Sequence, residues 1–215
     1  MGVLDLLMPP ACAACGRFGS VLCGPCVSLF RAPTRSDDRF VSPDAGVVIG
    51  ESLTLALAAF AYEGALRKAL QRLKYAGAAR VAEGLALAAV PTLRAVIQIS
   101  GPATLVPIPL HLRRQRERGY NQAGLLAEQL GRATGLAVAP ILVRGRETSR
   151  QHGLDRAARL RNLIAAFGLA GPVPPPTVIL VDDILTTSAT MEACASVLRA
   201  GGSEAVYGLA VGREV

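Results

Sequence analysis

The sequence predicts an α/β fold, a parallel sheet flanked by helices, that follows a small cysteine-rich module. From residue 53 onward, strand-like apolar segments alternate with helix-like segments, which is typical of parallel sheets with right-handed crossovers. Residues 178–181 are apolar without alternation, as expected of a strand that is buried on both faces. Near the N-terminus, four cysteines in two close pairs predict a metal-binding unit.

After residue 52, the sequence shows alternating strand and helix signals. The predicted strands cover residues 53–62, 104–109, 138–143, 165–169, 178–181 and 205–211. The predicted helices cover residues 63–75, 78–99, 121–134, 154–162 and 191–200. Pro91 interrupts the second helix, so a kink or a split is expected there. Because ligands of parallel sheets bind beyond the carboxyl ends of the strands, we expect the functional residues at that edge.

The most informative segment is 178–190, where a buried strand leads through two adjacent acids, Asp182 and Asp183, into a hydroxyl-rich loop. The loop opens a helix whose free N–H groups and positive dipole end can accept a phosphate. Paired carboxylates before such a loop can hold ribose hydroxyls, directly or through Mg²⁺. The plain alternative is a strand, an acidic turn and a Ser/Thr N-cap.

The composition narrows the classes of function. The chain has 215 residues, of which 51% are hydrophobic, enough for one full domain and a small appendage. It has four Tyr, five Phe and no Trp, which argues against aromatic-rich modes of binding single strands. Residues 111–161 hold eleven arginines and four acids, so this segment alone accounts for the net charge of +7. Such a segment attracts the phosphates of a nucleotide, a pyrophosphate or a nucleic acid, although solvated helix faces are the alternative.

The cysteines Cys12, Cys15, Cys23 and Cys26 form two Cys-x₂-Cys pairs, a pattern typical of a tetrathiolate site. Each pair can turn the chain so that both sulfurs face one tetrahedral ion, and thiolates suit Zn²⁺. Disulfides are the alternative, although nothing routes the chain to an oxidising compartment, and an iron–sulfur cluster is a further rival. Cys194, in the last predicted helix, is expected to be a buried apolar residue.

The sequence shows no targeting or membrane-spanning segment. The first eight residues contain an acid and no basic region, so no secretory signal is expected. No apolar run reaches the about 20 residues that span a bilayer, because Pro91 and Arg94 break the longest candidate. We therefore expect a soluble, cytoplasmic protein.

Three further groups of residues fit a phosphate-handling site. In the first, Arg67 and Lys74 are seven residues apart, close to two helical turns, and can share a face. The second is an arginine-rich segment with Arg114 and Arg118, which we expect to form a mobile loop over the site. The third spans residues 144–167, whose arginines could donate paired hydrogen bonds to phosphate. Solvated helix surface is the alternative for each.

The segment 178–190 resembles the phosphoribosyl pyrophosphate (PRPP) signature of the type I phosphoribosyltransferases. The resemblance implies a type I phosphoribosyltransferase-like fold in which Asp182 and Asp183 hold the ribose hydroxyls. The loop that would hold the 5-phosphate comprises Thr186, Thr187, Ser188, Ala189 and Thr190. The signature usually has glycine, which permits a positive φ and close backbone approach, at the position of Ser188. Ser188 could therefore weaken the phosphate site unless its hydroxyl donates a compensating hydrogen bond.

Nearly the whole chain, from Cys12 to about Gly208, resembles the ComF family, the relatives of competence protein F. The matching segments, in family order, are the cysteine pairs and residues 62–75, 106–109, 118–122, 159–167 and 178–190. The cysteine pairs, the polar and turn-forming residues after them and the first strand signal predict three parts. They are a four-cysteine zinc-binding module at 8–30, a linker at 31–52 and a domain at 53–215, which the resemblance implies is phosphoribosyltransferase-like.

This resemblance implies a role in DNA uptake during natural transformation. Single-stranded DNA and a helicase-like ATPase of the competence machinery would be partners, with no membrane insertion. The implied cofactors are structural Zn²⁺ and Mg²⁺ bound with PRPP. The residues assigned to catalysis are Lys74, Asp182 and Asp183, and those assigned to phosphate binding outside the loop are Arg67, Arg114 and Arg118.

Two functions remain open at the level of sequence. One is an enzyme of nucleotide salvage or metabolism that transfers ribose 5-phosphate from PRPP to an acceptor nitrogen, through positioning and electrostatics. The other is a binding module whose pocket senses PRPP or a nucleotide while the zinc module and the arginine-rich face hold DNA or a protein partner. No residues that recognise a base stand out, and together with Ser188 this favours the binding module.

Overall fold

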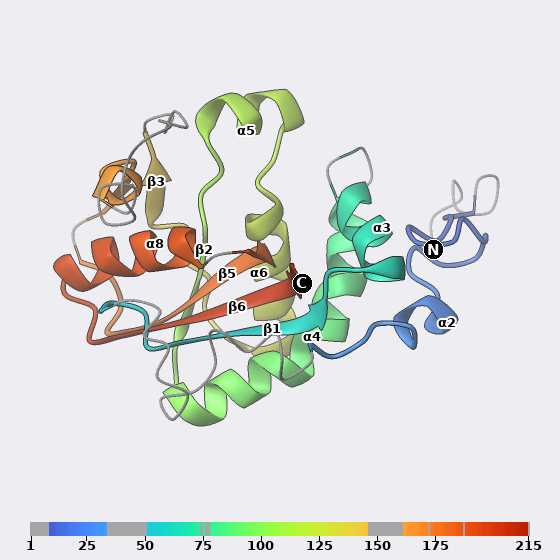
Figure 1. Ribbon diagram of the computed structural model, residues 1–215, viewed down its shortest axis with the longest axis horizontal. Coiled ribbons are helices and arrows are strands. Elements are labelled where there is room, and N and C mark those ends of the chain that lie inside the picture. Colours follow the sequence, from blue (N-terminus) through green and yellow to red (C-terminus); the bar gives the residue numbers. More distant parts are fainter. Residues whose placement is uncertain are drawn as a thin grey trace.

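A four-stranded parallel sheet forms the centre of the molecule (Figure 1), which confirms the predicted parallel α/β architecture. The computed structural model describes residues 9–33, 51–73, 75, 78–145, 161–171, 173–186 and 188–214. The strand order is β1-β6-β5-β2, and all neighbouring strands are parallel. These strands are β1 (Leu55–Ala61), β2 (Thr104–Pro107), β5 (Thr177–Leu185) and β6 (Ala205–Arg213). Their carboxyl ends therefore meet at one edge of the sheet.

Strand β5 is buried on both faces, which explains the unbroken apolar run that predicted it. Ile179 and Val181 pack into one hydrophobic cluster, whereas Val178 and Leu180 pack into a second cluster on the opposite face. The strand continues beyond the apolar run to Leu185, so the two acids of the signature lie inside it.

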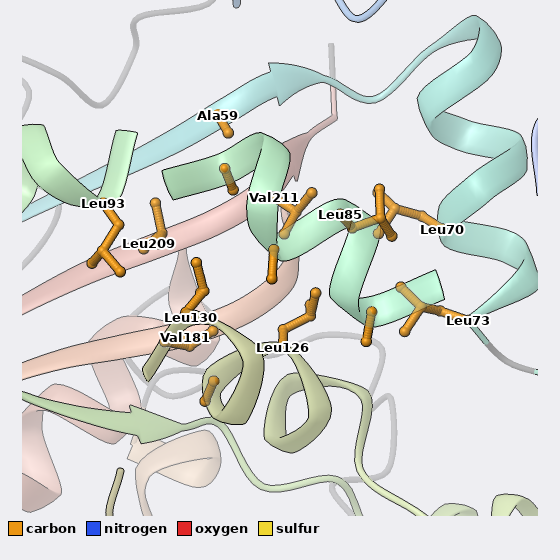
Figure 2. Packing of buried hydrophobic residues seen from close by; sticks show 14 of the residues in the cluster. Ala59, Leu70, Leu73, Leu85, Leu93, Leu126, Leu130, Val181, Leu209 and Val211 are labelled. Atoms are coloured by element: carbon orange, nitrogen blue, oxygen red, sulfur yellow. The ribbon is translucent and has the colours of Figure 1, made fainter. Parts of the chain in front are cut away.

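Helices cover both faces of the sheet (Figure 1). The helices that do so are α3 (Gly64–Arg72), α4 (Ala78–Ser100), α6 (Gln122–Thr134) and α8 (Ala189–Ala200). Helices α3, α4 and α6 pack on the face with the first cluster, and α8 packs on the other face. Figure 2 shows the first cluster, where Leu85 of α4 lies near Val211 of β6 and Leu130 of α6 lies near Val181 of β5. Four of the predicted helices are thereby confirmed.

Helix α4 runs through Pro91 without a break, so the predicted alternative of a split is wrong. Pro91 lies on the exposed side of the helix, where water can reach the carbonyl that lacks its N–H partner. By length and composition, Ala79–Ser100 could cross a membrane, and it is the only such helix in the described part of the chain. Its apolar side packs against β1, β6 and α6, as that of a core helix does.

Strands β3 (Leu142–Arg144) and β4 (Phe167–Leu169) form a separate antiparallel pair and do not extend the parallel sheet. The strand predicted at 138–143 is therefore mostly absent, and Val138 makes only an isolated bridge to Leu105. A short apolar run has the same pattern in either kind of pairing, so the sequence could not distinguish them. The helix predicted at 154–162 falls largely outside the described residues.

The arginine-rich segment predicted as a mobile loop is a helix, α5 (Leu112–Arg118). The His111 side chain caps it by accepting a backbone N–H, and Gly119 ends it with a φ of 80°. None of its residues is buried, so it lacks the apolar periodicity that predicts helices. Arg114 and Arg118 are four residues apart and lie on one side of this helix.

The cysteine-rich segment packs against the main body of the protein. Ala13 belongs to the first hydrophobic cluster, and Leu22 lies against it. The rings of Phe30 and Phe60 meet edge to face, with centroids 5.1 Å apart. The boundaries predicted at 8–30, 31–52 and 53–215 stay predictions, and residues 34–50 of the linker lie outside the described part.

Candidate functional site

A cavity of about 360 Å³ opens at the edge of the sheet where the parallel strands end. Residues at or just beyond the ends of β2, β5 and β6 line it, together with the start of α6 and one side of α5. Its polar lining residues are Tyr62, Arg114, Arg118, Asn121, Gln122, Arg144, Asp182, Asp183, Thr186, Thr190 and Glu214. Ligands of parallel α/β sheets bind at this edge, so the cavity is the candidate ligand site.

Two carboxylates form the acidic part of the cavity. Asp182 and Asp183 lie near the end of β5, and the Asp183 N–H donates to Oδ1 of Asp182 at 2.8 Å. Burial raises the pKa of Asp182 well above its usual range, and the adjacent Asp183 carboxylate raises it further. The Asp183 N–H and the charge of Arg144 oppose this shift. Hydrogen-bond donors such as ribose hydroxyls, or a cation, would relieve the repulsion between the two acids.

Three arginines bring positive charge to the same cavity. Arg114 and Arg118 project from α5, and Arg144 comes from β3. The Arg144 guanidinium lies 5.2 Å from the centre of the Phe167 ring on β4, and burial lowers its pKa. Planar guanidinium groups donate paired hydrogen bonds to phosphate, so this part of the cavity suits a phosphorylated ligand.

The loop between β5 and α8 has an unusual residue at the start of the helix. Ser188 adopts the left-handed conformation, with a φ of 51° and a ψ of −3°. Among the described residues it is the only non-glycine with a positive φ, the region that favours glycine. The residue is 3% exposed, and its Oγ has no hydrogen-bond partner in the described part of the chain. A buried hydroxyl without a partner costs free energy, so its burial adds to the strain at this position.

A short chain of hydrogen bonds fixes the cavity wall beside α6. The Asn121 side chain accepts the N–H of Ala123 at 3.1 Å, which caps α6. The same side chain donates to the Ile108 carbonyl at 2.9 Å, and the Ile108 N–H donates to the Val181 carbonyl at 2.9 Å. These bonds hold the start of α6 against the strand that carries the acids.

Two polar side chains that were not predicted as site residues support the site from outside. Glu192, in the first turn of α8, is buried and accepts the N–H groups of Ser52 and Leu53 at 3.0 and 3.1 Å. The Tyr120 hydroxyl lies within hydrogen-bond distance of two carbonyls of the turn after α3, at 2.8 and 2.9 Å, and its single proton can donate to either. Sequence reasoning missed both, because their partners lie far away along the chain.

The four N-terminal cysteines form a second candidate site. Their Sγ atoms all lie within 4.8 Å of one another, and all four thiols are free, so no disulfide links them. The Sγ atoms of Cys15 and Cys23 are 3.7 Å apart. Thiolates bound at about 2.3 Å around a tetrahedral ion would be separated by about 3.8 Å. The short helix α2 (Gly24–Val27) carries Cys26, and the cluster can hold a metal ion.

The thiols of this cluster differ in acidity. Burial disfavours the Cys12 thiolate, but the N–H groups of Cys23, Cys15 and Ala14 outweigh it and lower the pKa of Cys12 to about 6. Burial raises the pKa of Cys26, and the neighbouring sulfurs raise it further. Four thiolates this close repel one another, so a divalent cation is what would allow all of them to ionise.

Six residues predicted for the phosphoribosyl site line one cavity. They are Arg114, Arg118, Asp182, Asp183, Thr186 and Thr190. Ser188 and Ala189 begin α8 beside the cavity without lining it. Thr187 lies outside the described residues. The structure thus brings the predicted acids, the flanks of the loop and two of the predicted arginines together, while the roles of these residues remain predictions.

The other predicted residues lie away from the cavity or outside the described part of the chain. Arg67 does not line the cavity, but its guanidinium lies 5.8 Å from the ring centre of Tyr62, which does. Lys74 lies outside the described residues, so the face that it was predicted to share with Arg67 is untested. Cys194 is fully buried, as predicted.

Sequence comparison places the chain among known relatives. It is 40% identical over 119 residues to competence protein F of Haemophilus influenzae, a match that covers 53% of this chain and 52% of that protein. It is 34% identical over 149 residues to DNA utilization protein YhgH of Salmonella typhimurium, which covers 67% of this chain and 66% of that protein. It is 30% identical over 146 residues to competence protein ComFC of Bacillus subtilis, a match that covers 68% of this chain and 58% of that protein. The chain belongs to the ComF family.

The matches to these ComF relatives cover between 52% and 66% of the relatives' own length. No family model matches the chain. Among solved structures, a phosphoribosylpyrophosphate synthetase from Mycobacterium smegmatis superposes with a TM-score of 0.34 and 19% identity, over 56% of this chain and 33% of that one. The allosteric regulatory enzyme of purine biosynthesis superposes with a TM-score of 0.37 and 17% identity, over 61% of this chain and 26% of that one.

Proposed function

We propose that this ComF-family chain binds PRPP with Mg²⁺ in the cavity at the carboxyl edge of its sheet, and that it acts in DNA uptake during natural transformation. One observation carries the ligand assignment. Asp182 and Asp183 share a single cavity with three arginines and with Thr186 and Thr190, which flank the start of α8. The PRPP signature at 178–190 predicts this grouping of acids and phosphate loop.

Each part of PRPP has a matching group in the cavity. The 5-phosphate would lie at the N-terminus of α8, where backbone N–H groups and the hydroxyls of Ser188 and Thr190 can donate. The two carboxylates would accept hydrogen bonds from the ribose hydroxyls. Arg114 and Arg118 would face the pyrophosphate. Mg²⁺ would enter with PRPP and neutralise part of the pyrophosphate charge.

Transfer from bound PRPP needs no protein nucleophile. The bond between ribose C1 and the pyrophosphate oxygen would break as the acceptor nitrogen bonds to C1. Pyrophosphate would leave with the electron pair, and the acceptor nitrogen would lose its proton to water. Asp182 and Asp183 would hold the ring in position, and the arginines would stabilise the charge on the leaving group. Without an acceptor the same site binds PRPP as a sensor, and the strained backbone at Ser188 favours this second role.

We also infer that zinc stabilises the cysteine-rich segment as a module at 8–30, joined by a linker to a phosphoribosyltransferase-like domain at 53–215. The thiol spacing supports the metal, and so short a segment has little apolar core of its own. In the cytoplasm the protein would receive single-stranded DNA beside a helicase-like ATPase of the competence machinery. The names of two relatives, competence protein F and competence protein ComFC, support this role.

Calorimetry with PRPP and Mg²⁺ tests the pocket. The wild type should bind. Asp182→Asn/Asp183→Asn should bind at least about tenfold more weakly, because the two carboxyl groups proposed to accept the ribose hydroxyls are lost. Glu128→Gln, on the exposed side of α6, should bind like the wild type. Absence of binding by the wild type would refute the pocket. Pyrophosphate release with a panel of bases then separates an enzyme, which releases it with at least one base, from a sensor, which binds without release.

The proposed role in DNA uptake has its own test. In a transformable host, replacing the native gene with the Asp182→Asn/Asp183→Asn variant should lower the transformation frequency, and the wild-type gene should restore it. An unchanged frequency after deletion of the whole gene would refute the role in DNA uptake and leave the ligand assignment intact.

A further inference from the structure

We propose that the side of the cavity nearest to β1 and β6 binds a planar nitrogen heterocycle, and that Glu214 selects one whose edge presents two adjacent N–H donors. This assignment rests on the proposed PRPP site, because it names the class of acceptor that would lie beside the ribose. The lining residues that carry it are Tyr62, Ile184 and Glu214. None of the three was predicted to contact phosphate or ribose.

The order of the strands separates the charges of the cavity. Tyr62 directly follows β1, Glu214 directly follows β6, and the two acids of the signature lie near the end of β5. Two of the cavity's arginines come from α5, the helix that follows β2 at the opposite edge of the sheet. A pyrophosphate that faces these arginines would leave ribose C1 toward β2. The acceptor nitrogen would then approach C1 from the opposite side, where β1 and β6 end.

Tyr62 and Ile184 give this side of the cavity an apolar wall. Both are partly buried and pack against the first hydrophobic cluster. The Arg67 guanidinium lies over the Tyr62 ring, 5.8 Å from its centre, and the Tyr62 N–H donates to the Arg213 carbonyl at 2.6 Å. Among the described residues that line the cavity, Tyr62 is the only aromatic one. A ring fixed in this way and a branched aliphatic side chain suit the flat face of a heterocycle.

Glu214 is the only acid outside the signature among the described residues that line the cavity. Its N–H donates to the Leu185 carbonyl at 3.0 Å, which fixes its backbone beside the end of β5. The residue is exposed and forms no ion pair with any described residue, so its carboxylate can contact a ligand. A carboxylate accepts through two oxygens, so it pairs with an edge that carries two N–H groups and disfavours an edge that presents a ring-nitrogen acceptor.

Guanine has the edge that such a carboxylate selects. Its N1–H and its 2-amino group are adjacent donors, and its N9 lies on the opposite side of the ring system. A guanine whose N9 faces ribose C1 would therefore direct both donors away from the ribose, toward Glu214. Adenine presents an acceptor at N1, and hypoxanthine has the N1–H but lacks the amino group. The site should therefore prefer guanine to hypoxanthine, and hypoxanthine to adenine.

Calorimetry with nucleoside monophosphates tests the proposal on the full chain. Each carries the 5-phosphate, the ribose and a base without reacting, and ribose 5-phosphate is the reference that lacks a base. Guanosine monophosphate should bind the wild type at least about tenfold more tightly than adenosine monophosphate, because each hydrogen bond to a charged group is worth about tenfold or more in affinity. Inosine monophosphate should lie between the two.

Glu214→Gln isolates the carboxylate, and Glu128→Gln on the exposed side of α6 is its charge-matched control. The Glu214 variant should reduce the preference for guanosine over adenosine monophosphate to less than about threefold, without lower affinity for ribose 5-phosphate. The control should keep the preference of the wild type. Tyr62→Ala should weaken both nucleotides by about fivefold or more, whereas Tyr62→Phe should keep their affinity, since stacking needs the ring and not the hydroxyl.

Three results separate the failure of this proposal from that of the PRPP site. A wild type that binds ribose 5-phosphate but does not prefer guanosine monophosphate would overturn the acceptor assignment and leave the PRPP proposal standing. Equal losses of both nucleotides and of ribose 5-phosphate in Glu214→Gln would also overturn it, because Glu214 would then serve the ribose or Mg²⁺. A wild type that binds neither PRPP nor ribose 5-phosphate would refute the PRPP site, and the acceptor assignment with it.

Discussion

Replacing Ser188 by glycine tests the strained start of α8 most sharply. The residue combines a φ of 51° with a buried hydroxyl that has no partner among the described residues. Release of the left-handed backbone should stabilise the fold by about 1 kcal/mol, and removal of the unpaired hydroxyl by about 1 kcal/mol. The greater freedom of glycine in the unfolded chain offsets about 0.5–1 kcal/mol of this gain. We therefore expect Ser188→Gly to raise the free energy of unfolding by about 1 kcal/mol, and Tm by about 2–4 °C for a chain of this size.

Ser188→Ala separates the two contributions, because it removes the hydroxyl and keeps the strained backbone. Its Tm should lie between those of the wild type and the glycine variant in differential scanning fluorimetry. Calorimetry should show PRPP binding to the alanine variant weakened by about tenfold, since a hydrogen bond to a charged phosphate is worth about 1.5 kcal/mol. A glycine variant less stable than the wild type would refute the structural reasoning. Unchanged affinity in the alanine variant would show that the hydroxyl does not contact the phosphate.

Three further predictions concern the support of the site, its acids and the metal. Glu192→Gln should lower the free energy of unfolding by about 2 kcal/mol in urea titrations. The buried Glu192 carboxylate accepts two backbone N–H groups, whereas an amide can accept only through its one oxygen. An unchanged urea midpoint would contradict this prediction. Asp183→Asn should lower the pKa of Asp182, because the Asp183 charge raises it, so the pH below which Asp182 is protonated should fall. Carboxyl ¹³C NMR measures this pKa, and an upward shift would contradict the assignment. Purified protein should contain about one zinc per chain by elemental analysis, and a chelator should lower its Tm; a metal-free, equally stable protein would rule out the structural role.

Buried parallel strands were predictable from the sequence, whereas exposed or locally paired elements were not. Strand β5 gives an unbroken apolar run because both of its faces are covered, and α6 carries a capped start and an apolar face. Helix α5 has no buried residue, so its arginine-rich sequence looked like a loop. The antiparallel pairing of β3 with β4 depends on tertiary contacts, which a short apolar run does not encode.

Some residues of the candidate site were likewise predictable from the sequence, and others were not. Asp182, Asp183 and the loop after them are adjacent in sequence, so their grouping could be predicted. Tyr62 and Glu214 reach the same cavity only because their strands end at the same edge of the sheet. The strain at Ser188 was foreseeable from the absence of glycine, but the burial of its hydroxyl follows from packing alone.

A crystal structure of the protein with PRPP and Mg²⁺ would locate the bound phosphate and ribose. We expect the 5-phosphate at the N-terminus of α8, within hydrogen-bond distance of the Ser188 hydroxyl, and the ribose hydroxyls against Asp182 and Asp183. Density for PRPP at any other place would contradict the assignment of the signature loop as the phosphate site.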